Sequence, residues 1–402
     1  MRPIYLDNNA TTRADPAVVA AMLPFFSDQF GNASSSHAFG SEVAGAVKQA
    51  RRSLQALLGA AFDHEIVFTS SGTEADNAAI FSALDNRDGR DEIVTSAVEH
   101  PAILAPLDHL ESVRGIKVHR IGVDPQGRLD IEAYRRALGP RTALATVMSA
   151  NNETGTLFPV EQLAAMAHGA GALFHTDAVQ AVGKIALDLK PTLIDMLSLS
   201  GHKLHGPKGI GALYLRKGTP FNPLVRGGPQ ERRRRGGTEN VPAIVGLGKA
   251  AELALALMRD EPTRIRALRD RLERGILEFG HCMVLGDVEN RLPNTCNIAF
   301  AHIEGEAILH HLNKAGIAAS LGSACASGSM EPSHVLRAMN VPPSALRGAI
   351  RFSLSRDNTI DDVVCVLSLL PDIITRLRAL SPSAQTQAPV TASPSPSPEL
   401  TQ

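Results

Sequence analysis

Short apolar segments alternate with helical stretches between residues 65 and 216, and this alternation limits the possible folds more than any other feature. The apolar segments predict buried strands over residues 66–69, 92–95, 143–148, 173–175, 195–199 and 211–215. Helices are expected between them, for example over residues 74–83 and 160–167. Strands that alternate with helices form a mostly parallel sheet covered on both faces, and ligands bind at the carboxyl ends of its strands. The sequence therefore predicts an α/β fold.

The pattern changes after this region, which predicts a second domain. A Gly- and Arg-rich loop over residues 226–238 precedes helical sequence to about residue 258. Beyond it, the sequence predicts an amphipathic helix with apolar residues from Ile265 to Phe279, strands at 297–300 and 351–354, and a final helix from about Asp361. We expect a large domain over residues 16–258, which starts with Asp15 as N-cap and Pro16 as first helical residue. A smaller α+β domain is expected to combine residues 1–15 and 259–380.

Composition excludes several classes of protein. The 402 residues are 44% hydrophobic and 20% charged, as in a globular chain, and the net charge of -1 argues against a nucleic-acid-binding protein. No stretch approaches the roughly 20 apolar residues of a membrane span, so we expect a soluble, cytoplasmic protein that binds no membrane. Residues 381–402 are rich in Pro and Ser and have few large apolar side chains, so this tail is expected to be disordered.

A lysine follows a predicted buried strand directly, in the segment from Ser198 to Gly209. Small and imidazole side chains flank Lys203, and two of them, Ser200 and His202, can donate hydrogen bonds to an anion. A lysine in a turn is most often only an exposed residue. Its position after a strand instead favours an active-site amine that forms a Schiff base with a carbonyl.

An acidic residue follows a neighbouring predicted strand. Asp177 alone would most often cap a helix. Together with a Schiff-base lysine it suggests pyridoxal phosphate, because that cofactor acts as an electron sink only while a carboxylate keeps its ring nitrogen protonated. Gln180 is a candidate partner for the ring hydroxyl of the same cofactor.

Further strand ends carry groups that suit the same cleft. Ser71, Gly72, Thr73 and Glu74 open a helix whose free amides suit a phosphate, and Ser71 with Glu74 also fits a capping box. His100 follows another strand, and both a structural and a catalytic role are open for it. We expect a phosphate-binding turn, an imidazole, an acid and a lysine to meet in one cleft.

The four cysteines are too few for a disulfide framework, and they differ in their surroundings. Cys282, Cys296 and Cys365 lie in helix or strand contexts and are expected to be structural. Cys325 lies among Gly, Ser and Ala residues, which predict an exposed, mobile loop and make its thiol a candidate nucleophile.

Two arginine features have alternative interpretations. The run from Arg232 to Arg235 is flanked by Gly-Gly, which favours a loop that binds anions or a subunit partner over a nucleic-acid patch. Arg351 is the first residue of a predicted strand. Its side chain forms either a surface ion pair or a bidentate clamp on a substrate carboxylate, and the sequence leaves both interpretations open.

The motifs resemble, in the same order, those of the cysteine desulfurases, which are fold-type I, class V pyridoxal-phosphate enzymes with a mostly parallel seven-stranded sheet. The resemblance covers residues 4 to about 380 and rests on YLDNNATT, TSSGTEADN, VEHPAIL, ANNETGTLFP, FHTDAVQAVGK, SLSGHKLHGPKGIG, RGGPQERRRRGGTEN, LPNTCNIAF, GSACASGS and RFSLSR. The chain is most similar to the nitrogenase-associated NifS type and next to the housekeeping IscS type. Ala326, where Thr is frequent, and the Pro/Ser-rich tail depart from the family.

The resemblance implies which residues bind the cofactor, pyridoxal 5'-phosphate. Lys203 forms the Schiff base, and His100 stacks on the ring. The ring nitrogen and hydroxyl are bound by Asp177 and Gln180. The phosphate is bound by Gly72, Thr73, Ser200 and His202, and by Thr238 from the other subunit of a homodimer.

The resemblance also implies the reaction. Asn152 and Arg351 bind the carboxylate of L-cysteine, and Cys325 takes its sulfur as a persulfide while L-alanine is released. A NifU-type or IscU-type iron-sulfur scaffold protein then accepts the sulfur, for nitrogenase in the NifS type. No intrinsic metal is expected, although Cys325 is a candidate transient ligand of a cluster held with the scaffold. The alternatives are an IscS-type desulfurase, another class V enzyme such as an aminotransferase or selenocysteine lyase, and an inactive sulfur-relay protein.

Overall fold

The computed structural model of the chain describes residues 2–86, 89–322 and 332–380. Two predicted features, the Pro/Ser-rich tail over residues 381–402 and the nucleophile Cys325, lie outside the described residues.

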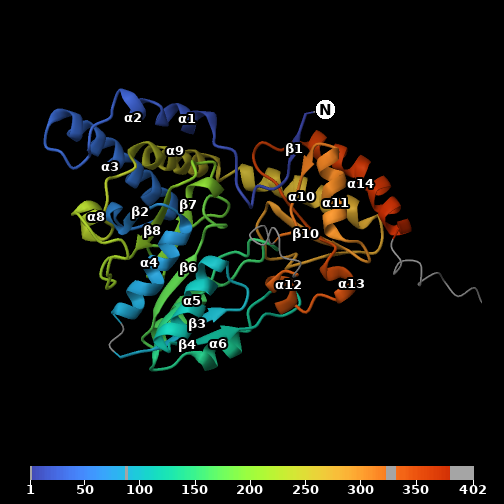
Figure 1. Cartoon of the computed structure of the whole chain (residues 1–402), viewed down its shortest axis with the longest axis horizontal. Coiled ribbons are helices and arrows are strands. Elements are labelled where there is room, and N and C mark those ends of the chain that lie inside the picture. The colour runs from blue at the N-terminus through green and yellow to red at the C-terminus, as the bar shows by residue number, and fades with distance from the viewer. Residues whose placement is uncertain (1, 87–88, 323–331, 381–402) are drawn as a thin grey trace, which may run out of the picture.

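A seven-stranded sheet in the order β2-β8-β7-β6-β5-β3-β4 forms the centre of the larger half of the molecule (Figure 1). Its strands are β2 (Ile66–Thr69), β3 (Glu92–Ser96), β4 (Lys117–Ile121), β5 (Thr142–Thr146), β6 (Leu173–Asp177), β7 (Met196–Ser200) and β8 (Gly211–Leu215). Neighbouring strands are parallel except at β8, which is antiparallel to both β2 and β7. The predicted, mostly parallel α/β sheet is therefore confirmed. The edge strand β4 was not among the expected segments, because only Val118 and Ile121 in it are apolar.

Helices cover both faces of this sheet, as the alternating pattern predicted. Side chains on one face, such as Ile66 and Phe68, pack with α3, α7 and α9, whereas Val67 between them packs with α4 and α5 on the other. The helices of this half are α1 (Pro16–Met22), α2 (Pro24–Ser27), α3 (Ala38–Leu58), α4 (Gly72–Asp85), α5 (Pro101–Arg114), α6 (Ile131–Ala137), α7 (Val160–Gly169), α8 (Gln230–Arg233) and α9 (Val241–Leu257). Two short 3-10 turns are η1 (Asp63–Glu65) and η2 (Gly201–Lys203).

The start of α1 and the arginine-rich segment test two local predictions. The Asp15 carboxylate accepts a hydrogen bond from Ala17 N at 2.8 Å, which confirms Asp15 as N-cap. The expected loop over residues 226–238 includes a four-residue turn, α8, whose interior does not have helical backbone angles. Its residues Glu231 to Arg233 have positive φ angles, a backbone conformation that no sequence periodicity reveals.

A second core lies in the C-terminal part of the chain and includes two residues from the N-terminus, Ile4 and Leu6. A three-stranded sheet in the order β12-β10-β9 and the short pair β1-β11 lie here, with β1 beside the C-terminal elements in Figure 1. The elements are β1 (Ile4–Tyr5), α10 (Glu261–Leu277), β9 (Cys282–Val284), β10 (Thr295–Phe300), α11 (Gly305–Lys314), β11 (Ile317–Ala318), α12 (His334–Ala338), α13 (Pro343–Leu346), β12 (Ala349–Ser353) and α14 (Ile360–Leu380). The domain boundaries at residues 15 and 258 stay a prediction.

Within the described ranges, no single helix is long and apolar enough to cross a membrane, and α9 with α10 passes that test only as a pair bent by 77°.

Candidate active site

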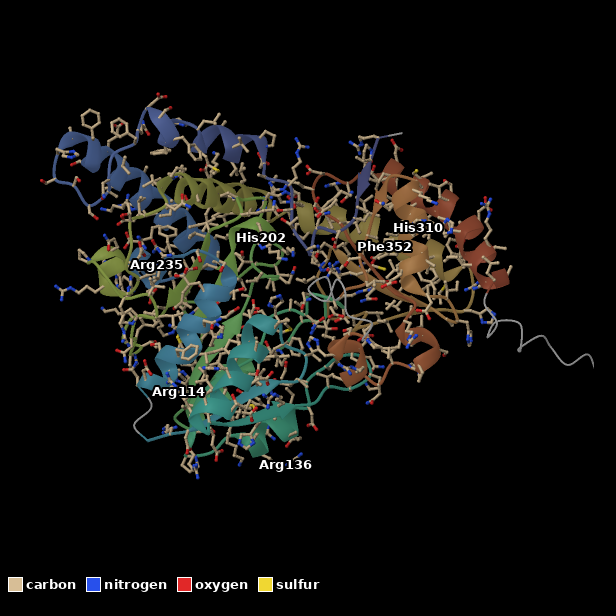
Figure 2. The ribbon with its side chains drawn as sticks, in the orientation of Figure 1. Arg114, Arg136, His202, Arg235, His310 and Phe352 are labelled. Carbon is tan, nitrogen blue, oxygen red and sulfur yellow. The ribbon has the colours of Figure 1, made fainter. Side chains whose placement is uncertain are left out.

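A cavity of about 490 Å³ lies at the carboxyl ends of the sheet strands, and residues from both halves of the molecule line it. His202 lies on the side of the large sheet that is turned toward the C-terminal elements, which carry Phe352 (Figure 2). The predicted site residues that line the cavity are Gly72, Thr73, His100, Asn152, Asp177, Gln180, Ser200, His202, Lys203 and Arg351. A cavity of this size is typical of small-molecule sites.

Lys203 reaches this cavity because a tight turn, η2, follows strand β7 directly. The turn begins at Gly201, where a Cβ atom would lie 2.8 Å from Ile210 Cγ2 and 2.9 Å from Pro207 O, so a larger residue does not fit. The Lys203 amine donates hydrogen bonds to two backbone carbonyls of the N-terminal segment, Asn9 O at 2.5 Å and Ala10 O at 2.7 Å. The N-terminus of the chain thus positions the lysine.

Asp177 lies at the end of β6 and is almost fully buried. Its carboxylate accepts a hydrogen bond from Val179 N at 2.9 Å, so it also shapes the following turn. Burial raises the pKa of Asp177, and the nearby His100 partly opposes this rise. A carboxylate in such a place gains stability from a cationic partner in the cavity, such as a protonated ring nitrogen.

Two other buried carboxyl groups lie near Asp177. Burial raises the pKa of Asp76 well above its usual range, and it raises that of Glu99 to about 8. Glu99 accepts hydrogen bonds from Ser96 Oγ at 2.5 Å and from Met148 N at 3.0 Å. Asp76 Oδ1 has no hydrogen-bond partner among the described residues. Burial therefore disfavours the charged form of all three carboxyl groups, and Asp177 is the one whose pKa rise is opposed by positive neighbours, His100 and Lys203.

The first turn of α4 forms one end of the cavity. Ser71 Oγ accepts from Glu74 N at 3.1 Å, but the Glu74 carboxylate accepts from Ser70 N rather than from Ser71 N, so only half of the predicted capping box forms. A Cβ atom on Gly72 would lie 2.7 Å from Val179 Cγ2. The backbone here therefore packs against Val179 as closely as only glycine allows, and the free amides of this first turn suit a bound phosphate.

Two of the three histidines that line the cavity, His100 and His202, are held by their Nδ1 atoms. His202 Nδ1 lies 3.1 Å from Thr11 Oγ1, and burial lowers the His202 pKa to about 4, so the ring is neutral. If Nδ1 accepts a hydrogen bond from the hydroxyl, Nε2 carries the ring proton and can donate a hydrogen bond to an anion. His100 Nδ1 accepts from Ala102 N at 3.1 Å as the N-cap of α5, and burial lowers the His100 pKa. His100 therefore caps α5 and also lines the cavity wall.

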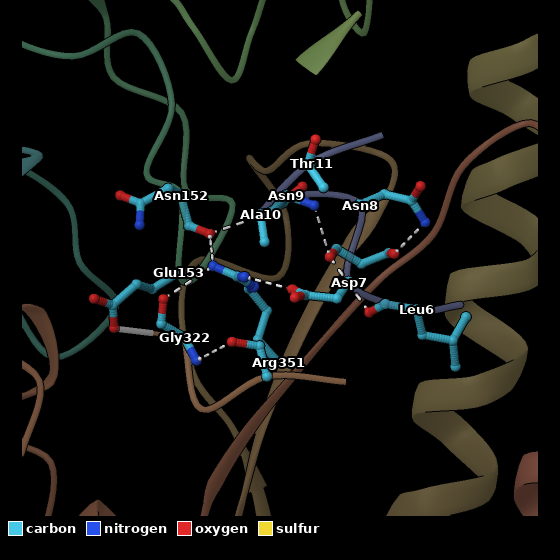
Figure 3. Close-up of polar contacts among 12 residues, drawn as sticks. Leu6, Asp7, Asn8, Asn9, Ala10, Thr11, Asn152, Glu153, Gly322 and Arg351 are labelled. Atoms are coloured by element: carbon cyan, nitrogen blue, oxygen red, sulfur yellow. Dashed lines mark hydrogen bonds and ion pairs between the residues drawn. The ribbon is translucent and has the colours of Figure 1, made fainter. Parts of the chain in front are cut away.

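Arg351 on β12 is buried and holds three parts of the chain together (Figure 3). Its guanidinium donates to Asp7 Oδ1 at 2.7 Å, to Asn152 O at 2.9 Å and to Gly322 O at 3.0 Å. The surface ion pair is wrong, because the Arg351 side chain is buried, whereas the bidentate clamp on a substrate carboxylate stays a prediction. The same side chain lines the cavity, where its Nε has no hydrogen-bond partner among the described residues.

We expect Arg351→Lys to raise the KM for L-cysteine about ten-fold or more and to leave the cofactor bound. An ammonium cannot donate in the plane of a carboxylate as a guanidinium does, and one charge-assisted hydrogen bond contributes about 1.5–3 kcal/mol. Steady-state kinetics would measure the change, with Arg347→Lys as matched control because Arg347 is exposed. An unchanged KM would exclude Arg351 as a substrate-binding residue.

Two predicted site residues do not join this cavity in the described part of the chain. Thr238 is exposed and lines a separate pocket with Ser70. Cys325 lies outside the described residues. Of the other cysteines, Cys296 is fully buried on β10, and burial raises the pKa of its thiol well above the usual range, as suits a structural residue. Among the described side chains, no group of three or more His, Cys, Asp or Glu is placed to bind a metal ion.

The sequence reasoning missed several residues that shape the cavity. They are Asn9 and Ala10, which hold Lys203, together with Asp76, Glu153 and His334, which line the wall. Asn9 and Ala10 belong to the motif YLDNNATT, Asp76 belongs to TSSGTEADN, and Glu153 belongs to ANNETGTLFP. The polar residues of these motifs were therefore a signal that could have indicated further residues of the site.

Comparison with known proteins identifies the class of this fold and site. Residues 4–366 match the model of the aminotransferase class-V family. The chain therefore belongs to the class-V aminotransferase family.

Among curated relatives, a cysteine desulfurase of Gluconacetobacter diazotrophicus is 70% identical over 95% of this chain and 96% of its own. The cysteine desulfurase NifS of Azotobacter vinelandii is 58% identical over 97% of each chain. A solved NifS-like protein superposes with a TM-score of 0.87 at 36% identity, covering 93% of this chain and all of its own. Within the class-V family, the chain groups with the cysteine desulfurases.

Proposed function

We propose that this chain is a pyridoxal-phosphate-dependent cysteine desulfurase, which converts L-cysteine and an enzyme thiol into L-alanine and an enzyme persulfide. The observation that carries the proposal is one cavity that Lys203, Asp177, His100, the first turn of α4 and Arg351 all line. High identity to cysteine desulfurases supports the same reaction. One similar solved structure, at 35% identity and a TM-score of 0.78, is described as SspA in complex with cysteine.

The residues of the cavity fit pyridoxal phosphate. The Gly72 turn and the neutral His202 suit the phosphate, the buried Asp177 suits a protonated ring nitrogen, and Lys203 suits the carbonyl. When bound, this cofactor withdraws electrons from the α-carbon of an amino acid. Asp177 keeps the ring nitrogen protonated, because burial of its charge without a cation is unfavourable.

Lys203 and Arg351 act on the substrate itself. We assign the removal of the proton on the α-carbon of L-cysteine to Lys203 Nζ, which Asn9 O and Ala10 O hold at the cavity wall. Asn152 and Arg351, which line the same cavity, orient the substrate carboxylate. This placement keeps the α-carbon next to the amine.

Cys325 is assigned the sulfur transfer on the basis of the resemblance. Its thiolate attacks the sulfur of L-cysteine, so an S–S bond forms while the C–S bond breaks. The carbon fragment takes up one proton at its β-carbon, regains one at its α-carbon and leaves as L-alanine, and the enzyme retains the persulfide.

The finer features of the function rest on the family resemblance. We infer a cytoplasmic homodimer in which Thr238 of one subunit reaches the phosphate of the other, and a NifU-type or IscU-type scaffold protein that accepts the sulfur. The similarity of this chain to the cysteine desulfurase NifS of Azotobacter vinelandii favours the nitrogenase-associated role over the housekeeping role.

The proposed function predicts that the purified protein, loaded with pyridoxal phosphate, releases equal amounts of alanine and sulfide from L-cysteine and dithiothreitol. No keto acid is needed, because no amino group is transferred. Amino-acid analysis and sulfide determination would measure both products. Turnover that requires a keto acid would show an aminotransferase instead, and no visible cofactor band would contradict the cofactor assignment.

A further inference from the structure

A second lysine lies behind the cavity, and no step of the proposed mechanism uses it. Lys184 follows the turn after β6, and its amine donates a hydrogen bond to Gln180 Oε1 at 2.7 Å. Gln180 Nε2 in turn donates to Asn9 O at 3.0 Å. The same carbonyl oxygen accepts the hydrogen bond from Lys203 Nζ. Lys184 is thus linked to the proposed catalytic lysine through one amide and one carbonyl.

These two contacts determine which way the Gln180 amide faces. An amide side chain carries an acceptor oxygen and a donor nitrogen that exchange places when it rotates by 180°. A backbone carbonyl only accepts, so Asn9 O requires the amide nitrogen of Gln180 on its side, and this orientation presents Oε1 to the donors of Lys184. Gln180 is nearly fully buried and lines the cavity. Its NH2 group has one N–H that does not point to Asn9, and this N–H is the group available to a ligand.

The surroundings of Lys184 are crowded with charge. Burial, together with the positive charges of Lys203 and Arg351, lowers its pKa to about 7. The small adjoining cavity of about 30 Å³ is also lined by Lys203, His205, Glu261 and Arg356. A protonated amine at this place is costly, and the hydrogen bond to Gln180 Oε1 offsets part of that cost.

We propose that Lys184 is a positioning residue that holds Gln180 with its N–H toward the ring oxygen of bound pyridoxal phosphate. The proposal rests on the proposed function. An N–H donated to that oxygen stabilises the oxygen as an anion, which lowers the proton affinity of the neighbouring nitrogen of the cofactor–lysine linkage. The charge on Lys184 acts in the same direction.

The visible spectrum of the loaded protein tests this role without reference to activity. Lys184→Met keeps a side chain of similar length but removes the hydrogen-bond donor. In this variant, the pH midpoint of the cofactor absorption band should rise by about 0.5 to 1 unit. Lys184→Arg should largely restore the wild-type midpoint, because it keeps the donors and the charge. Lys190→Met is the matched control, since Lys190 is exposed, and its midpoint should not move.

A double-mutant cycle separates positioning from a direct effect of charge. In a Gln180→Ala background, Lys184→Met should cause little further shift if Lys184 acts through the amide. The same shift in both backgrounds, or no shift in Lys184→Met, would overturn the proposal. If Lys184→Met does not fold, Lys184→Gln takes its place in the experiment. In Lys184→Gln, the pH midpoint of the cofactor band should rise by a smaller amount, and an unchanged midpoint would contradict the proposal. A wild-type protein without any cofactor band would instead refute the proposed function.

Discussion

The Cys325→Ala variant is expected to bind pyridoxal phosphate normally and to lose at least about 1000-fold in the release of alanine and sulfide. Cofactor binding and removal of the α-proton depend on Lys203 and the cavity, all within the described residues. Sulfur transfer needs a second nucleophile, and a thiolate is the reactive form of cysteine. The variant should therefore still change its visible spectrum when L-cysteine is added. Absorption spectroscopy and product analysis would measure the two effects separately.

Mass spectrometry of the wild-type protein after a single turnover locates the sulfur directly. The added mass of one sulfur should lie on the peptide that contains Cys325. Cys282→Ala is the matched control, because Cys282 is partly buried on β9 and burial raises the pKa of its thiol, so full activity is expected. Sulfur on Cys282, Cys296 or Cys365, or full activity in Cys325→Ala, would refute the proposed sulfur transfer.

The Lys203→Ala variant is expected to lose the covalent link to the cofactor and at least about 1000-fold in turnover. The amine at the end of η2 is the group that we assign both to the cofactor carbonyl and to the α-proton. No other lysine side chain lines the large cavity in the described part of the chain. Borohydride reduction followed by peptide mass spectrometry should find the cofactor on Lys203 in the wild type and on no peptide of the variant.

Lys208→Ala is a suitable control for this experiment. Lys208 lies five residues further along the same loop and is exposed, so the variant should bind the cofactor and turn over L-cysteine at the wild-type rate. Turnover by Lys203→Ala at that rate, or cofactor attached to Lys184 in the wild type, would show that the lysine was assigned wrongly.

The sequence predicted the α/β sheet and most positions of its chemistry for a simple physical reason. Buried parallel strands are continuous apolar segments, and their carboxyl ends all meet at one edge of the sheet. Lys203, Asp177, His100 and Gly72 each follow such a segment, so their presence around one cavity followed from local patterns alone. The family motifs then indicated the chemistry, which comparison with cysteine desulfurases supports.

The tertiary structure decided the contacts between segments that are distant in sequence. The hydrogen bonds from Lys203 to Asn9 and Ala10 join residues almost 200 positions apart, and the ion pair between Arg351 and Asp7 joins residues 344 apart. No periodicity or propensity encodes such pairs, because each depends on how two elements pack and not on either element alone. The same holds for Gln180, which lines the cavity, and for Lys184 behind it, because their contacts depend on how the turn after β6 packs against the N-terminal segment. Sequence by itself therefore determined which groups end at the edge of the sheet, whereas packing decided which way each of them faces and which partner holds it there.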